Sequence, residues 1–155
     1  MNKKAYILIG APGSGKSTWG KDLIAKDPSV VRLCPDDFRA QFGTGEGDQS
    51  VSAQAFEATR NGMKEALKNG NNVLIDATNM YRKTRGDFVR IAQFGNAKTI
   101  AVVFEATKEI LLERNKMRGA AGGRDVPEFV IDNMLRKYET PTTQEFDEVI
   151  FISKV

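Results

Sequence analysis

The sequence contains no histidine and only one cysteine, Cys34, in 155 residues. Without imidazole, a general base must be a carboxylate or, failing that, a lysine, cysteine or tyrosine side chain. A single cysteine excludes an internal disulfide and a cluster of thiolate metal ligands. No apolar run approaches the ~20 residues that a membrane-spanning helix needs, so no membrane partner is expected. Residues 1–4 show no cleavable signal pattern, and the expected setting is the reduced cytoplasm of a cell or host cell.

The charge balance is also modest. The chain has 23 Lys and Arg residues against 20 Asp and Glu residues, for a net charge of +3. This excess permits an anionic substrate without requiring one. The 41% hydrophobic content supports a core, and the length predicts a single domain over residues 1–155.

Apolar runs and helical patterns alternate along the chain. The apolar runs predict buried strands at residues 5–9, 30–34, 72–76, 98–104 and 148–152. Helices are predicted at residues 16–26, 51–67 (ending at Gly70), 81–94 and 108–117, and from Pro127 onward. This alternation predicts an α/β fold with a five-stranded, mostly parallel sheet flanked by helices. Two segments rich in glycine and charge, 43–49 and 118–125, have the composition of loops.

The clearest motif lies between the first predicted strand and helix. Residues 10–17, GAPGSGKS, match the phosphate-loop pattern G-x-x-x-x-G-K-[ST] in the required context. Backbone N–H groups of such a loop surround an anion, and the helix N-terminus adds partial positive charge. Lys16 is predicted to reach the β and γ phosphates of ATP or another nucleoside triphosphate, and Ser17 to bind Mg²⁺. The predicted nucleotide contacts here are Gly10, Pro12, Gly13, Ser14, Gly15, Lys16, Ser17 and Thr18, whereas Trp19 is expected to pack in the core.

The second predicted strand ends in Asp36 and Asp37, at the sheet edge where ligands bind in open parallel sheets. If a short helix begins there, Asp36 and Arg39 share one face and can address the same acceptor group. A carboxylate can accept the proton of an attacking hydroxyl while the arginine holds a phosphate. The alternative is that an aspartate caps the helix and Arg39 is solvated.

Two further segments carry candidate site residues. Asp76 ends the third predicted strand, where it could help to hold hydrated Mg²⁺ or the acceptor, while Thr78 or Asn79 is expected to cap the next helix. Arg114 and Arg118 lie at positions i and i+4 before a glycine-rich segment. Arginines on a mobile lid could close over a triphosphate, although an exposed basic helix face is the alternative.

In this order, GAPGSGKSTW, DDFR, DATN and ERNKMRG resemble the 5′-kinase domain of bacteriophage polynucleotide kinase and of bacterial end-healing polynucleotide kinases. The resemblance implies a P-loop kinase fold that transfers the γ-phosphate of a nucleoside triphosphate to the 5′-hydroxyl end of DNA or RNA. It implies Lys16 and Ser17 at the phosphates and Mg²⁺, Asp36 as general base and Arg39 on the acceptor phosphate. It also implies Arg114 and Arg118 as lid arginines, with Arg124 an unmatched addition to the lid.

Two rival functions remain open from the sequence. One is a related kinase with a small-molecule or tRNA-linked acceptor, because the same fold serves many acceptors. The other is a nucleotide-dependent binding or regulatory module, against which the Asp36 and Arg39 pair argues. The sequence shows no interleaved aromatic and basic residues, so contacts are expected only with the terminal nucleotides of a polymer.

Overall fold

A computed structural model describes residues 3–123 and 125–153, so Arg124 lies outside the described residues. Within these residues one sheet is formed in the order β2-β3-β1-β4-β5, and every neighbouring pair is parallel. The predicted five-stranded parallel sheet is therefore confirmed, with boundaries that differ by two residues at most. The strands are β1 (Lys3–Ile9), β2 (Val31–Leu33), β3 (Val73–Ile75), β4 (Ala97–Glu105) and β5 (Glu148–Ser153).

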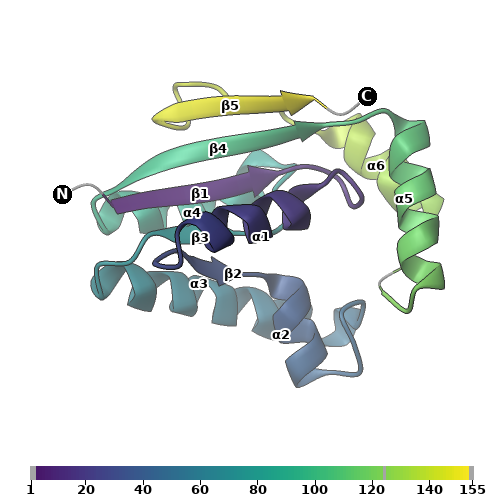
Figure 1. The fold of residues 1–155 in the computed structure, drawn as a ribbon, viewed down its shortest axis with the longest axis horizontal. Coiled ribbons are helices and arrows are strands. Elements are labelled where there is room, and N and C mark those ends of the chain that lie inside the picture. The colour runs from purple at the N-terminus through teal and green to yellow at the C-terminus, as the bar shows by residue number, and fades with distance from the viewer. Residues whose placement is uncertain (1–2, 124, 154–155) are drawn as a thin grey trace.

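Helices cover both faces of the sheet and its carboxyl edge (Figure 1). Helix α1 (Lys16–Lys26) packs on one face through Trp19, Leu23 and Ile24. Helices α3 (Ser52–Lys68) and α4 (Arg82–Phe94) pack on the other. Three elements lie around the carboxyl ends of the strands: α2 (Pro35–Phe42), α5 (Lys108–Ala120) and α6 (Glu128–Lys137).

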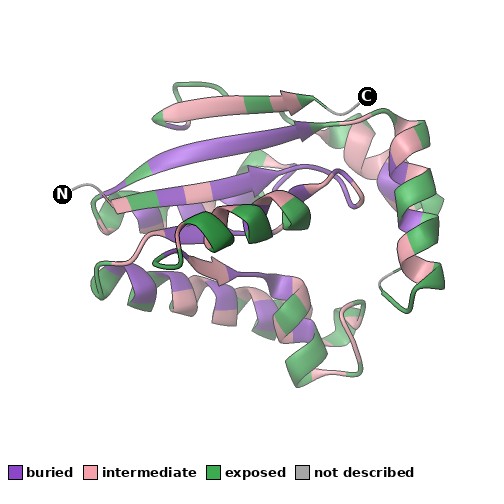
Figure 2. Cartoon of the chain, in the orientation of Figure 1, coloured by how far each residue is buried: buried purple, intermediate pink, exposed green. Residues whose placement is uncertain are grey.

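The central strands are buried because both of their faces are covered. Figure 2 shows β1 and β4 mostly buried, whereas the edge strand β5 is intermediate or exposed. Trp19 makes edge-to-face contacts with Tyr6 and Phe104, which confirms its expected place in the core. Parallel strands bring their carboxyl ends to one edge, so the segments after β1, β2 and β3 meet there.

The two glycine-rich segments differ from the expectation of simple loops. Helix α5 continues to Ala120, so Arg118 and Gly119 are helical. In the segment before the short 3₁₀ helix η1 (Gln49–Val51), the Asp48 carboxylate accepts hydrogen bonds from the backbone N–H groups of Thr44 and Ser50, both at 3.0 Å. These bonds and those from the two hydroxyl groups lower the pKa of Asp48 to about 2. Asp48 thus orders the segment that enters α3.

Candidate nucleotide and acceptor site

The phosphate loop (residues 10–17) connects β1 to α1 and has the backbone shape of an anion cradle. Gly13 and Gly15 adopt positive φ angles of 86° and 100°, which side chains disfavour. A Cβ atom on Gly13 would also lie 3.0 Å from the Leu111 carbonyl oxygen on α5. The Gly10 N–H donates to the Thr78 carbonyl at 2.9 Å and ties the loop to the segment after β3. The cradle therefore fits the polyphosphate of a nucleotide, with α1 directed at it.

Lys16 is buried at the start of α1, and its Nζ donates to the Ala11 carbonyl at 3.1 Å. Burial lowers the pKa of Lys16 to about 8, although the carboxylates of Asp76 and Asp36 partly oppose this shift. Because these carboxylates offset only part of the cost of burying the Lys16 ammonium group, the site favours an anionic ligand.

Ser17 and Asp76 meet beside the loop. The Ser17 hydroxyl donates to Asp76 Oδ2 at 2.9 Å, and the Asp76 side chain is only 3% exposed. Hydroxyl and carboxylate oxygens are ligands that Mg²⁺ prefers, so these residues fit a magnesium ion shared with nucleotide phosphates. Among the described residues no group of three or more His, Cys, Asp or Glu side chains could hold a metal by itself. Magnesium at this position would therefore depend on the phosphates and water for most of its ligands.

Arg32 in β2 also binds Asp76, and sequence reasoning missed it. Its Nη2 donates to Asp76 Oδ2 at 2.7 Å, and its Nη1 donates to Asp37 Oδ2 at 2.8 Å. An arginine inside an apolar strand needs a buried partner, because an unpaired buried charge is costly. That signal was present in the run VVRLC. Arg32 thus links the aspartates that follow β2 and β3.

Asp36 and Arg39 lie together in the first turns of α2, as their i and i+3 spacing predicts. Arg39 Nη1 forms an ion pair with Asp36 Oδ1, and Arg39 Nε donates to the Ser52 hydroxyl at 2.9 Å. The guanidinium carbon lies 5.6 Å from the centre of the Phe56 ring. The alternative of a solvated Arg39 is wrong, because its side chain is only 8% exposed. Helix α2 begins at Pro35 after Cys34 in the N-cap position, so neither aspartate is its cap.

Two adjoining cavities, of about 510 and 190 Å³, meet at these residues. The larger one runs along the phosphate loop, and the smaller one reaches Arg39 and Phe56. Both are lined by Lys16, Ser17, Cys34, Asp36 and Arg118. Burial is the main cause that raises the pKa of the Cys34 thiol to about 11. At neutral pH the thiol is therefore uncharged where it lines the two cavities. The geometry therefore offers a donor side and an acceptor side with Asp36 between them.

The expected capping of α4 by Thr78 or Asn79 is wrong. Tyr81 occupies the N-cap position, and no side chain caps the helix. Asn79 instead has a φ of 49°, and its Nδ2 donates to the Leu8 carbonyl at 2.8 Å. The segment after β3 is thus fastened to the end of β1, which holds Asp76 against the phosphate loop.

The two predicted lid arginines lie on α5, facing the loop. Arg114 Nη1 donates to the Gly13 carbonyl at 3.3 Å, and Arg118 lines both cavities. Arg118 Nη2 also donates to Asn115 Oδ1 at 3.1 Å. Asn115 Oδ1 accepts a hydrogen bond from the Val126 N–H at 2.9 Å, and Asn115 Nδ2 donates one to the Val126 carbonyl. Asn115 was not predicted; it fastens α5 to the segment that enters α6.

The structure thus brings most of the predicted site residues to these two cavities, including Asp36, Arg39, Asp76, Arg114 and Arg118. The predicted nucleotide contacts Gly10 and Ser14 line neither cavity. Thr18 also lines the larger cavity. Within residues 3–123 and 125–153, no helix is both long and apolar enough to cross a membrane.

A five-stranded parallel sheet, a phosphate loop at its carboxyl edge and helices on both faces define the fold of P-loop kinases. A family model of AAA domains matches residues 6–141. The chain belongs to this family.

Three of the proteins to which the chain is similar are named as kinases or as part of an RNA repair complex. The chain is 32% identical over 142 residues to L-seryl-tRNA(Sec) kinase of Methanococcus maripaludis, covering 89% of this chain and 53% of that protein. It is 32% identical to a chain of the Pnkp1/Rnl/Hen1 RNA repair complex, with a TM-score of 0.77 over 87% of this chain and 43% of that one. A fungal RNA kinase shares the fold, with 18% identity and a TM-score of 0.65 over all of this chain and 76% of that one. The chain thus spans about half of its first-named relative and less than half of the repair-complex chain.

Proposed function

We propose that this chain is a polynucleotide 5′-kinase domain, which transfers the γ-phosphate of ATP or another nucleoside triphosphate to the 5′-hydroxyl of DNA or RNA. The observation that carries the proposal is the Asp36–Arg39 pair in the smaller cavity, next to Lys16 and Ser17. A protein that only binds or hydrolyses nucleotide has no use for a carboxylate and a guanidinium placed to receive an acceptor.

Each side of the site has a role in this proposal. The phosphate loop and Lys16 hold the triphosphate, and Ser17 with Asp76 would hold a Mg²⁺ ion, which would neutralise phosphate charge during transfer. Asp36 accepts the proton of the attacking hydroxyl, and Arg39 binds the phosphate next to that hydroxyl. Arg114 and Arg118 neutralise the charge that develops during transfer.

A tRNA-linked acceptor is the second candidate, and the similarity to L-seryl-tRNA(Sec) kinase favours it. There too a hydroxyl near a polynucleotide end would receive the phosphate, so the donor side would act in the same way. The difference concerns what fills the smaller cavity: a nucleotide with its phosphate or an aminoacyl group. Arg39, a rigid donor for phosphate oxygens, fits the nucleotide better.

The test is incubation with γ-labelled ATP, Mg²⁺ and a panel of acceptors. The panel contains 5′-hydroxyl DNA, 5′-hydroxyl RNA, a 3′-nucleoside monophosphate, a free nucleoside and seryl-tRNA. Label in the oligonucleotides or the 3′-monophosphate supports the proposal. Label only in seryl-tRNA supports the second candidate, and phosphate release without a labelled acceptor refutes both.

A further inference from the structure

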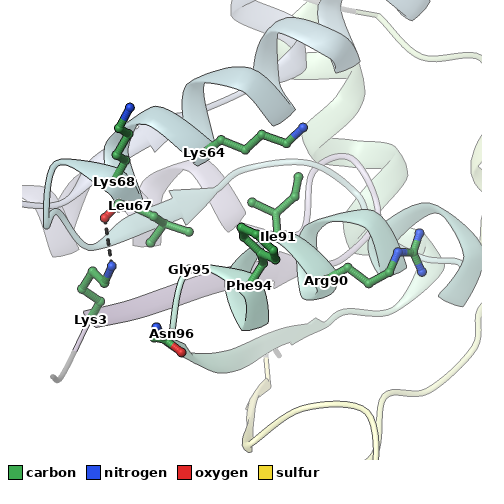
Figure 3. Close-up of a pocket in the computed structure, with 9 residues that line it drawn as sticks. All are labelled: Lys3, Lys64, Leu67, Lys68, Arg90, Ile91, Phe94, Gly95 and Asn96. Atoms are coloured by element: carbon green, nitrogen blue, oxygen red, sulfur yellow. Dashed lines mark hydrogen bonds between the residues drawn. The ribbon is translucent and has the colours of Figure 1, made fainter.

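A further cavity lies away from the phosphate loop, where α3 and α4 end near the start of β1 (Figure 3). We call it the rear groove; it has a volume of about 750 Å³. Lys64 and Lys68 extend from α3 on one side, and Arg90 and Phe94 come from α4 on the other. None of the functional roles proposed so far uses this groove.

The groove is basic and carries an exposed aromatic ring. Its charged lining residues are all cations: Lys3, Lys64, Lys68 and Arg90. Asp87 lies outside the lining and offsets part of this charge through its ion pair with Arg90. The Phe94 side chain is 94% exposed. Cations beside an exposed aromatic ring match the phosphates and bases of a single-stranded nucleic acid, whose bases stack without sequence preference.

A row of side chains on α3 connects the acceptor cavity with the rear groove. Phe56, which lines the acceptor cavity, is followed at steps of four residues by Arg60, Lys64 and Lys68. Side chains spaced in this way form one ridge on a helix surface. At 1.5 Å per residue the ridge is ~18 Å long, a distance that a few extended nucleotides can span. Lys64 and Lys68 are exposed, Arg60 is half-buried, and an ion pair joins Arg60 to Asp87 at 4.0 Å.

We infer that the rear groove binds the body of the single-stranded nucleic acid whose 5′ end enters the acceptor cavity. The inference rests on the proposed function, because it identifies the acceptor as a strand several nucleotides long. The linear sequence hides this surface, since its basic and aromatic residues come from β1, α3 and α4 and meet only in the fold.

The experiment compares acceptors of two lengths. A dinucleotide reaches only the acceptor cavity, whereas a single strand of ~12 nucleotides can also reach the groove. In Lys64→Ala/Lys68→Ala, we expect the Kd of the longer strand to rise ~10-fold, and the slope of log affinity against log salt to shrink by ~1.4, which is ~0.7 for each lost phosphate contact. Phe94→Ala should raise that Kd ~5-fold or more with an unchanged slope, because it removes stacking and no charge. KM for the dinucleotide should stay unchanged in both variants.

Lys26→Ala/Lys137→Ala is the matched control, since it removes two exposed lysines outside the groove. Equal effects of the two double variants on the longer strand would overturn the inference, as would an unaltered Kd in the groove variants. The second result would show that the strand does not occupy the groove. Fluorescence anisotropy with a 5′-phosphorylated strand measures binding without transfer. It therefore tests the groove separately if the protein phosphorylates neither acceptor and the proposed function fails.

Discussion

At the scale of single residues, the site depends on buried charge. Lys16 has a pKa lowered to about 8 by burial, so it begins to lose its charge just above neutral pH. A bound triphosphate stabilises the ammonium form and raises this pKa. Affinity is therefore full below the pKa of the free protein and falls, by at most ~10-fold per pH unit, as pH rises between the two pKa values.

The first prediction is that ATP affinity falls as pH is raised from ~7 to ~9. The measurement is calorimetric titration with a non-hydrolysable ATP analogue and Mg²⁺ at several pH values. The thiol of Cys34, with a pKa raised to about 11, stays protonated throughout and does not contribute. In Lys16→Ala the affinity should be weak and independent of pH across this range; a variant that retains the same pH dependence would assign the titration to another group.

The two neighbouring aspartates provide a second test at this scale. Asp36 pairs with Arg39 in the acceptor cavity, whereas Asp37 pairs with Arg32 and is 58% exposed. Asp36→Asn should lower kcat by ~10²- to 10⁴-fold, because an amide cannot accept the proton of the attacking hydroxyl. Asp37→Asn should change kcat far less. Steady-state kinetics with saturating ATP measures both effects. A larger loss in Asp37→Asn would show that Asp37, and not Asp36, is the general base.

At the scale of elements, local patterns predicted most of the fold. The strands and the phosphate loop were identifiable because apolar runs, glycine positions and helix starts depend on nearby residues. Contacts between distant segments could not be identified in this way. Asn79 reads as a helix cap in the sequence, yet it bonds the Leu8 carbonyl across the sheet. Asn115, in the middle of a polar helix, gives no sign that it bonds Val126. Arg32 is the exception, because its charge in an apolar strand signals a buried partner.

Asn115 leads to the prediction at this scale. Asn115→Ala removes both bonds to Val126 and the acceptor for Arg118, so the segment after α5 should separate more often from the helix. Compared with the unaltered protein, we expect the variant to be cleaved faster by protease between residues 118 and 125 and to have a lower kcat. Adding ATP and Mg²⁺ should slow this cleavage. Limited proteolysis followed by mass spectrometry measures the cleavage rates.

Asn133→Ala is a matched control on α6, where Asn133 likewise accepts from an arginine three residues later, Arg136. It should leave both cleavage and kcat nearly unchanged. Equal cleavage of Asn115→Ala and the unaltered protein would show that Asn115 does not hold this segment.

At the scale of the whole molecule, Arg85 ties α4 and the segment that precedes it to the distant chain between α6 and β5. This fully buried residue of α4 donates to Glu145 through Nε at 2.6 Å and Nη2 at 2.8 Å. Its Nη1 donates to the Asn79 carbonyl at 3.1 Å and to the Glu139 carbonyl at 2.7 Å. One guanidinium thereby joins α4, the segment after β3 and the chain between α6 and β5. The segment after β3, which Arg85 holds, contains both Asp76 and Asn79.

The last prediction follows from this burial. Arg85→Ala leaves the Glu145 carboxylate, which is 12% exposed, without its main partner and should lower the free energy of unfolding by ~3–5 kcal/mol. Urea denaturation followed by circular dichroism measures this loss. Arg82→Ala is the control, because Arg82 is 60% exposed and approaches Glu145 only to 3.9 Å; its effect should stay within ~0.5 kcal/mol. Adding Glu145→Gln to Arg85→Ala should recover part of the loss, since a neutral amide costs less to bury than an unpaired charge. Equal losses in Arg85→Ala and Arg82→Ala would mean that burial adds nothing to this ion pair.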